Sequence, residues 1–250
     1  MSATMLLPPS KRKAEGGDGP AYGAGPAHAG RLAGARTMLM DAVSTEVPVL
    51  DDAAVARICG VRSAEVGWAR ELLAGVVDAP TMRASRRYTG VVFNNAALDG
   101  RAPSTSMAVL IVSPLMGLVA PGEPVPMYRL EFSASLPHHG SIAGFWRAQA
   151  GDVLATALAA GPVWDLLPGE HARIWRGDAR EHPHHHGFRF VRSDGRAANA
   201  ARTKLLKGRV AKWLLDHPAA GPHDLTAGLE LPDGWATAEA GRGDVTFTEA

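Results

Sequence analysis

Four polar side chains of this sequence could transfer protons or attack an electrophile. Glu131 lies beside an arginine, Asp165 ends a predicted strand, and Glu170 lies in the loop that follows, so each is a candidate general acid or base. Lys204 could act as an amine nucleophile if its surroundings removed it from water. Carboxylates in such places also cap helices or pair with cations, and the sequence leaves both roles open.

Histidines occur in two clusters that could bind a metal ion. EHPHHHG holds four of them, at positions 182, 184, 185 and 186, and LPHHG holds His138 and His139. Adjacent histidines in loops rich in proline or glycine lack the fixed geometry and supporting hydrogen bonds of a metal centre, so we interpret them as incidental surface residues. The single cysteine, Cys59, excludes an internal disulfide and a cysteine-based zinc site. We expect no metal and no cofactor.

Composition narrows the class of protein further. The 26 basic and 25 acidic residues give a formal net charge of +1, so any attraction to nucleic acid must come from local clusters. The chain has no run of about eighteen apolar residues that would span a membrane. GxSxG, HExxH, Walker and Rossmann patterns are also absent, which argues against the most recognisable enzyme classes. We expect a cytoplasmic monomer that does not enter a membrane.

The most basic run, RTKLLKGRVAKWLLDH at 202–217, is predicted to form a helix over about 202–216. At 3.6 residues per turn, Leu206, Val210 and Leu214 share an apolar face with Trp213. Gly208 then falls near the opposite face. Because glycine inside a helix costs about 1 kcal/mol relative to alanine, a glycine between lysines on the outward face indicates close approach of an anion. A solvated basic helix explains the same pattern more simply.

Residues 51–75 are predicted to form a helix-hairpin-helix-like element. An aspartate at 51 or 52 can cap a helix through Cys59, Gly60 can begin a turn, and Ser63 can cap a second helix. The amides of such a turn can contact a phosphate, and Arg62 adds charge where DNA-binding versions have a second glycine. Packing of two helices would give the same pattern without a ligand.

The remaining elements predict a mixed α/β fold: a single domain over residues 1–250, with a central mixed sheet and flanking helices. The continuous apolar run MAVLIVSP at 107–114 is predicted to be a central strand, and 4–7 a second buried strand. Alternating apolar residues at 127–132 predict a further strand or strand edge. Residues 14–30, rich in Gly, Ala and Pro, are predicted to be an irregular loop.

Six segments, taken together, resemble the YaaA family of peroxide-stress proteins. In order, they are LLPPSK at 6–11, RYTG at 87–90, SPLMGLVAP at 113–121, YRLEF at 128–132, FW at 145–146 and KLLKG at 204–208. The resemblance implies a cytoplasmic α/β protein with a helix-hairpin-helix element and a basic cleft, which binds DNA and limits oxidative damage linked to intracellular iron. Distant relatives of the domain are linked to modification of 7-deazaguanine bases in DNA, which leaves an enzyme open.

The resemblance also implies a site, formed by the positions that match the family's loops and basic helix. These positions are Ser10, Lys11, Tyr88, Thr89, Gly90, Tyr128, Arg129, Leu130, Lys204, Lys207 and Gly208. The chain departs from the family at Pro168 and His171, where a small hydroxyl residue and a tyrosine are usual. It departs again at Arg202 and Thr203, where an aromatic residue followed by Asn or Ala is usual. Two site loops have therefore changed.

Two functional hypotheses follow. In the first, a stress protein binds DNA in a basic cleft, with a phosphate at the hairpin; the residues expected to do so are Lys11, Arg62, Arg87, Arg129, Lys204 and Lys207. In the second, an enzyme of a specialised biosynthetic pathway acts on a nucleobase-like or other small anionic substrate, with Lys204 and one carboxylate among Glu131, Asp165 and Glu170. An open groove would favour duplex DNA, and a closed pocket would favour a small molecule.

Overall fold

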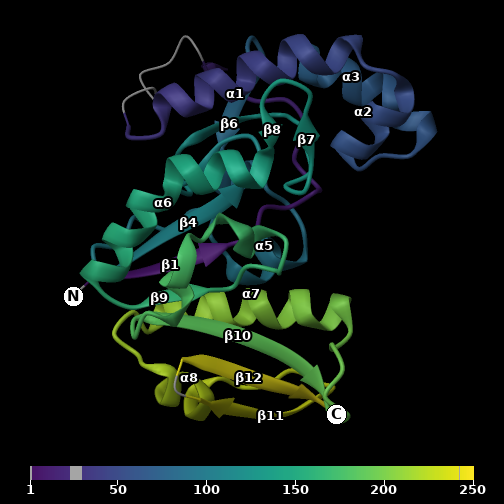
Figure 1. Cartoon of the computed structure of the whole chain (residues 1–250). Helices are drawn as coiled ribbons and strands as arrows, with labels where there is room; N and C mark the ends of the chain where they lie inside the picture. The colour runs from purple at the N-terminus through teal and green to yellow at the C-terminus, as the bar shows by residue number, and fades with distance from the viewer. Residues whose placement is uncertain (1, 23–29, 242) are drawn as a thin grey trace.

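A seven-stranded sheet lies at the centre of the computed structural model, which describes residues 2–22, 30–241 and 243–250 (Figure 1). The strand order is β11-β12-β10-β9-β1-β4-β5. The five inner strands pair in parallel, and the two edge strands are antiparallel to their neighbours. The bounds are β1 Ala3–Leu7, β4 Met107–Ser113, β5 Gly117–Val119, β9 Val163–Asp165, β10 His185–Arg192, β11 Trp235–Ala240 and β12 Asp244–Glu249.

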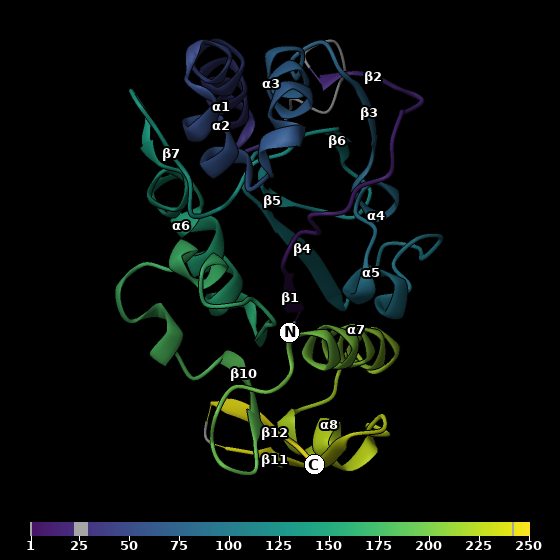
Figure 2. The same cartoon turned by 90° about the vertical axis from the view of Figure 1, so that its right-hand side faces the viewer.

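Helices cover both faces of this sheet. Figure 2 shows α6 on one side of β1 and β4, with α5 and α7 together on the other side. The helix bounds are α1 Ala33–Glu46, α2 Asp52–Cys59, α3 Val66–Ala74, α4 Ala84–Arg87, α5 Val91–Ala96, α6 Ile142–Ala160, α7 Ala200–Asp216 and α8 Pro222–Gly228. Within the described ranges, no helix has the length and apolar character needed to cross a membrane. The predicted mixed α/β fold and its central mixed sheet are confirmed.

Short elements complete the fold. The 3-10 turns span Val47–Val49, Ser63–Glu65, His171–Ile174 and Gly177–Glu181. Strands β2 Gly19–Ala21, β3 Pro80–Arg83 and β6 Pro124–Pro126 form a small antiparallel sheet, and β7 Ser135–Leu136 pairs with β8 Gly140–Ser141. The loop predicted over 14–30 therefore includes a short strand, and its residues 23–29 lie outside the described part of the chain.

The strand prediction for 107–114 is confirmed as β4, and the one for 4–7 as β1. Both consist mainly of apolar residues because a parallel strand inside the sheet is covered on its two faces by helices. Their register pairs Ala3 with Met107 and Leu7 with Ile111. The sheet is centred on β9, with β1 beside it, so β4 lies closer to one edge than expected.

The helix pair expected at 51–75 is present as α2 and α3. Asp51 caps α2, since its Oδ1 accepts the amide of Ala54 at 2.7 Å, and Gly60 ends that helix with a left-handed φ of 60°. The second cap differs from the prediction. The Glu65 carboxylate accepts the amide of Arg62 at 3.0 Å, and a 3-10 turn from Ser63 precedes α3.

The strand predicted at 127–132 is wrong. Its alternation is real, because Tyr128, Leu130 and Phe132 are buried, but the backbone joins no sheet. The amide of Glu131 instead donates to the carbonyl of Ile58, at the end of α2, at 2.9 Å. A loop in which every second side chain is buried reproduces the period of a strand without strand pairing.

Candidate functional site

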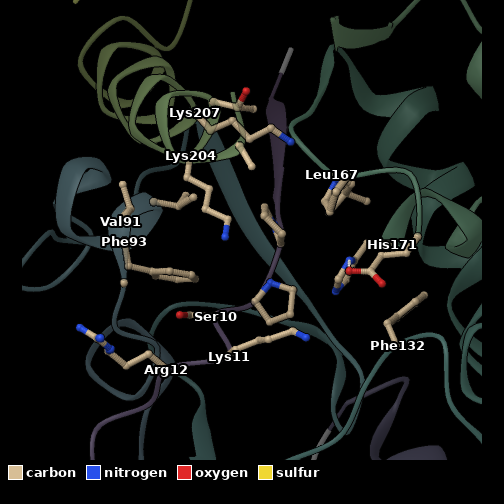
Figure 3. Close-up of a pocket in the computed structure, with 18 of the residues that line it drawn as sticks. Ser10, Lys11, Arg12, Val91, Phe93, Phe132, Leu167, His171, Lys204 and Lys207 are labelled. Carbon is tan, nitrogen blue, oxygen red and sulfur yellow. Dashed lines mark ion pairs between the residues drawn. The ribbon is translucent and has the colours of Figure 1, made fainter. Parts of the chain in front are cut away.

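A cavity of about 780 Å³ opens where the chain leaves the carboxyl ends of β1, β4 and β9. Segments 8–13, Pro114 and 167–171 line it from those strand ends, and 90–94, 128–132 and residues of α7 line its other sides. Parallel strands direct their following loops to one edge of the sheet, which is where open α/β sheets bind ligands. Figure 3 shows side chains from these segments converging on the cavity.

Lys207 reaches the cavity from α7 and is 7% exposed. Its Nζ donates to the carbonyl of Leu166 at 2.7 Å and lies 5.2 Å from the centre of the Phe190 ring. Burial lowers the pKa of this amine to about 8, although the nearby carboxylate of Asp165 acts in the opposite direction. Lys207 is therefore an interior residue of the site rather than an exposed cation of a solvated basic helix.

Lys204 lies one turn earlier on α7 and is exposed. Figure 3 shows Lys204 and Lys207 reaching toward the same space, with Phe93 on one side and His171 on the other. The two lysines thus enter one cavity from different depths, Lys204 from its rim and Lys207 from its interior.

Gly208 does not face an anion, and the expectation that it points outward is wrong. It is buried against α5, where an added Cβ would lie 2.5 Å from Asn95 Cβ and 2.7 Å from the carbonyl oxygen of Val92. Glycine is needed here because two helices approach closely, and α5 begins one wall of the cavity. The residue supports the site through packing.

The loop after β1 is fastened to the start of α5. Ser10 donates its hydroxyl to the carbonyl of Thr89. Gly90 follows with a φ of 141°, and a Cβ at that position would lie 2.6 Å from Ser10 Oγ. Lys11 reaches across the loop to Glu131, with 2.6 Å between Nζ and Oε1. Ser10 and Lys11 line the cavity, and Thr89 contributes its backbone carbonyl to the contact with Ser10.

Lys13 is a site residue that the sequence did not single out. Its Nζ lies 4.0 Å from the centre of the Tyr128 ring and donates to the carbonyl of Ser10 at 3.0 Å. Burial and the charge of Arg129 lower the pKa of Lys13 to about 7. In the run Lys11-Arg12-Lys13, nothing in the sequence distinguishes the member that turns inward.

Arg129 joins the first loop to the turn after α2. Its guanidinium donates to the carbonyls of Cys59, Lys11 and Gly60, at 3.1, 3.0 and 3.1 Å respectively. A Cβ at Gly60 would fall 2.0 Å from Glu131 Oε1, so this turn is also shaped by the carboxylate beside it. Arg129 lines the cavity, but these carbonyls occupy much of its donor capacity.

Tyr88 and Tyr128 form a buried hydroxyl chain under the cavity. Their hydroxyls are 2.9 Å apart, and Tyr128 lies 2.9 Å from Ser113 Oγ. Burial raises the pKa of Tyr88 to about 12 and that of Tyr128 well above 10. Both phenols stay protonated near neutral pH, so they support the cavity floor as neutral hydrogen-bonding groups.

Two predicted cations are not brought to the cavity. Arg87 is fully buried and donates to the carbonyls of Val125, Ala14 and Pro80, so it holds the small sheet to its neighbours. Arg62 is exposed on the turn after α2 and pairs with Glu65. Neither side chain lines the cavity.

The three candidate carboxylates occupy different environments. Glu131 and Glu170 line the cavity, the first paired with Lys11 and the second half-exposed. Asp165 is buried beneath it. Its Oδ1 accepts the amide of Leu167 at 2.9 Å, and its Oδ2 accepts from Trp175 Nε1 at 2.8 Å and contacts His185 Nε2 at 3.0 Å. These contacts give Asp165 a supporting role in this structure.

The interpretation of the histidine cluster as incidental surface is wrong for His185. This residue is 2% exposed and lies in β10 beside β9, where strand pairing brings it to Asp165. The others do not assemble into a metal centre: in the described ranges, no group of three His, Cys, Asp or Glu side chains could hold an ion.

His171, one of the departures from the family pattern, forms part of the cavity wall. Its ring stacks on Phe132 with 4.8 Å between centres. Burial, together with the positive charge of Lys207, lowers the pKa of His171 to about 4, so the imidazole is neutral at pH 7. Its Nδ1 is 3.5 Å from Glu170 Oε1 and has no hydrogen-bond partner among the described residues.

Comparison of the sequence with known proteins finds one matching family and similar chains. The model of a family described as peroxide stress protein YaaA matches residues 4–237. UPF0246 protein SCO2297 of Streptomyces coelicolor is 29% identical over 234 residues, which cover 90% of this chain and 88% of that protein. UPF0246 protein CE1889 of Corynebacterium efficiens is 29% identical over 239 residues, which cover 92% and 90% respectively.

Proposed function

The chain belongs to the YaaA family of peroxide stress proteins, and from that premise we propose that its cavity binds a small anionic ligand with a flat, nucleobase-like part. The observation that carries the proposal is the position of Lys207, a cation with 7% exposure at the inner end of a cavity of about 780 Å³. Pockets of roughly 300–1,000 Å³ suit small molecules. A DNA backbone lying across the surface would not reach this amine.

The walls of the cavity supply complementary chemistry for such a ligand. Phe93 and the His171–Phe132 pair present aromatic rings, which favour stacking with a flat group. Lys204 and Lys207 provide positive charge to an oxyanion on the same ligand. Charge and aromatic surface therefore lie within the span of one small molecule.

The proposal extends to catalysis on the bound ligand. Lys207, with its pKa lowered to about 8, and Lys13, with its pKa lowered to about 7, can both exchange protons near neutral pH. His171 stays neutral and can donate or accept a hydrogen bond. Among the predicted carboxylates, Glu131 and Glu170 are the ones that face this space.

Calorimetric titration with mononucleotides and with inorganic phosphate tests the proposal. We expect a mononucleotide to bind wild type and to bind at least about tenfold more weakly to Lys207→Met, since a charge-assisted contact contributes about 1.5–3 kcal/mol. Arg209→Met is the matched control, because Arg209 is exposed on the same helix and does not line the cavity. Equal affinity of both variants, or no binding by any probe, would reject the proposal.

DNA binding on the surface beside the cavity is the second candidate function. Four exposed cations favour it, Lys11, Arg12, Arg62 and Lys204, which stand on three separate segments. Arg129 joins the turn that precedes Arg62 to the Lys11 loop, so these two segments are neighbours. Filter binding at low salt tests this role, and Arg62→Ala should reduce the salt dependence by about one unit per lost phosphate contact. Unchanged salt dependence would argue against it.

We propose that the family's role in peroxide stress does not depend on a reaction of Cys59 with peroxide. Cys59 is fully buried, and burial raises the pKa of its thiol to about 11. Peroxide reacts with the thiolate, which is scarce for such a group near pH 7. We propose that limitation of peroxide or iron damage depends on the bound ligand instead. The proposal includes a cytoplasmic monomer, which cell fractionation and light scattering test.

A further inference from the structure

We infer that Lys207 is a nucleophilic amine that forms an imine with a carbonyl group of the ligand in the cavity. The inference rests on the proposed function, because it assigns a reactive group within that binding site. It goes further by naming the chemical class of the ligand, an anionic carbonyl compound, and the atom of the protein that bonds to it.

The distribution of lysine in this chain gives the first support. Only five of the 26 basic residues are lysines, and the rest are arginines. Four of those five line the cavity, Lys11, Lys13, Lys204 and Lys207, and the fifth is Lys212. Arginine binds anions well but is not deprotonated in proteins, whereas a lysine amine can lose its proton and attack carbon. Most lysine amines of this arginine-rich chain therefore lie around one cavity.

The contacts of Lys207 single it out among these four. Its hydrogen-bond acceptor is the neutral carbonyl of Leu166 at 2.7 Å, whereas Lys11 is paired with a carboxylate at 2.6 Å. Lys204 is exposed to water. Lys13 lies against the Tyr128 ring and donates to Ser10 in its own loop. In the described part of the chain, neither Lys207 nor Lys13 has an ion-pair partner, and of these two Lys207 is buried whereas Lys13 is partly exposed.

Burial keeps the neutral form of Lys207 accessible, against the effect of one neighbouring carboxylate. Asp165 faces it from β9, but both oxygens of that carboxylate contact other groups. His171 faces it from the 3-10 turn as a neutral imidazole, and Lys204 lies one turn away on α7. With its pKa at about 8, roughly a tenth of the amine is neutral at pH 7, against about one part in 3,000 for an ordinary lysine.

The covalent step balances with the groups present. The lone pair of neutral Lys207 Nζ forms a bond to the carbonyl carbon, and the carbonyl π electrons move to oxygen, which takes up a proton. Nitrogen loses a proton, giving a carbinolamine. Loss of the hydroxyl as water, with a second proton lost from nitrogen, gives the imine. No oxidant or reductant enters this step.

Competitive labelling of the full chain tests the inference. Formaldehyde forms imines with amines, and cyanoborohydride added in the assay reduces them to stable products that peptide mass mapping assigns among five lysines. We expect Lys207 to be modified at least about tenfold faster than Lys212 at pH 7, because burial lowers the pKa of Lys207 to about 8 and leaves roughly a tenth of its amine neutral. Its rate should level off just above pH 8.

Glyoxylate, a small anionic aldehyde, supplies the second arm. Reductive trapping should place glyoxylate on Lys207 in wild type, and Lys207→Arg should remove that adduct while it leaves labelling at Lys212 unchanged. A Lys207 rate no faster than that of Lys212, or a rate still rising at pH 10, would overturn the inference. If mononucleotides bind and Lys207 is unreactive, the imine is rejected and the binding function stands. If Lys207 reacts but no anion binds, the proposed function is the part that fails.

Discussion

Replacing Lys207 by methionine should stabilise the fold while it weakens ligand binding. In the folded protein, burial lowers the pKa of Lys207 from 10.5 to about 8. A pKa difference of one between the folded and unfolded chain corresponds to about 1.4 kcal/mol, so charging this amine opposes folding by about 3 kcal/mol at most. Loss of the hydrogen bond to Leu166 subtracts about 1 kcal/mol. Lys207→Met should therefore be more stable at pH 7 by about 1–3 kcal/mol.

The pH dependence gives this prediction its sharper form. Between pH 8 and 10.5 the unfolded chain still binds the proton that the folded protein has released, so wild-type stability rises with pH across that interval. Methionine carries no such proton. The advantage of Lys207→Met should be complete below pH 8 and should shrink to zero or below as the pH approaches 10.5.

Urea unfolding at pH 7 and pH 9.5, followed by far-UV circular dichroism, measures both quantities. Lys212→Met is the matched control, since Lys212 is half-exposed and pairs with Asp216 on the surface of α7. It should change stability little at either pH. Two results would refute the idea that burial of the charged Lys207 amine opposes folding. One is a wild type that is more stable than Lys207→Met at pH 7. The other is a stability difference between the two proteins that does not shrink by pH 9.5.

Three further predictions concern the supports of the site. Gly208→Ala should lower stability by about 1–3 kcal/mol through overpacking against α5, whereas Gly67→Ala, with open space around it, should stabilise slightly; urea midpoints that move in the same direction would contradict this. Cys59 should resist iodoacetamide and peroxide at pH 7 in the folded protein and react after unfolding, because burial raises its pKa to about 11; rapid labelling of the folded form would contradict it. Arg129→Ala should increase amide hydrogen exchange in the turn after Cys59, since three carbonyl contacts are lost; unchanged exchange there would show that the turn is held by other contacts.

The fold was predictable where the pattern of side chains reflects local geometry. Leu206, Val210 and Leu214 repeat at helical spacing, and all three are buried in α7. The apolar run of β4 is equally direct, since a strand covered on both faces has no need of alternation. The segment 127–132 also alternates, because every second side chain of this loop is buried, and period alone does not separate such a loop from a strand.

The site was less predictable because its decisive contacts join distant parts of the chain. Gly208 was placed outward on a helix considered alone, and only the position of α5 makes it a buried contact. Lys13, and not Lys11, lies over the ring of Tyr128, which is more than a hundred residues away in the sequence. His185 belongs to a histidine-rich run, yet pairing of β10 with β9 buries it at Asp165. Spacing along one segment carries no information about such partners.

The affinities of a mononucleotide and of duplex DNA, each measured with wild type, Lys207→Met and Arg62→Ala, separate the two candidate functions. A mononucleotide should bind wild type, lose at least about tenfold in affinity in Lys207→Met, and bind Arg62→Ala unchanged, because Lys207 lines the cavity and Arg62 does not. The opposite pattern would contradict the proposed function: duplex DNA bound in a way that depends on Arg62 and not on Lys207, with no mononucleotide bound at all.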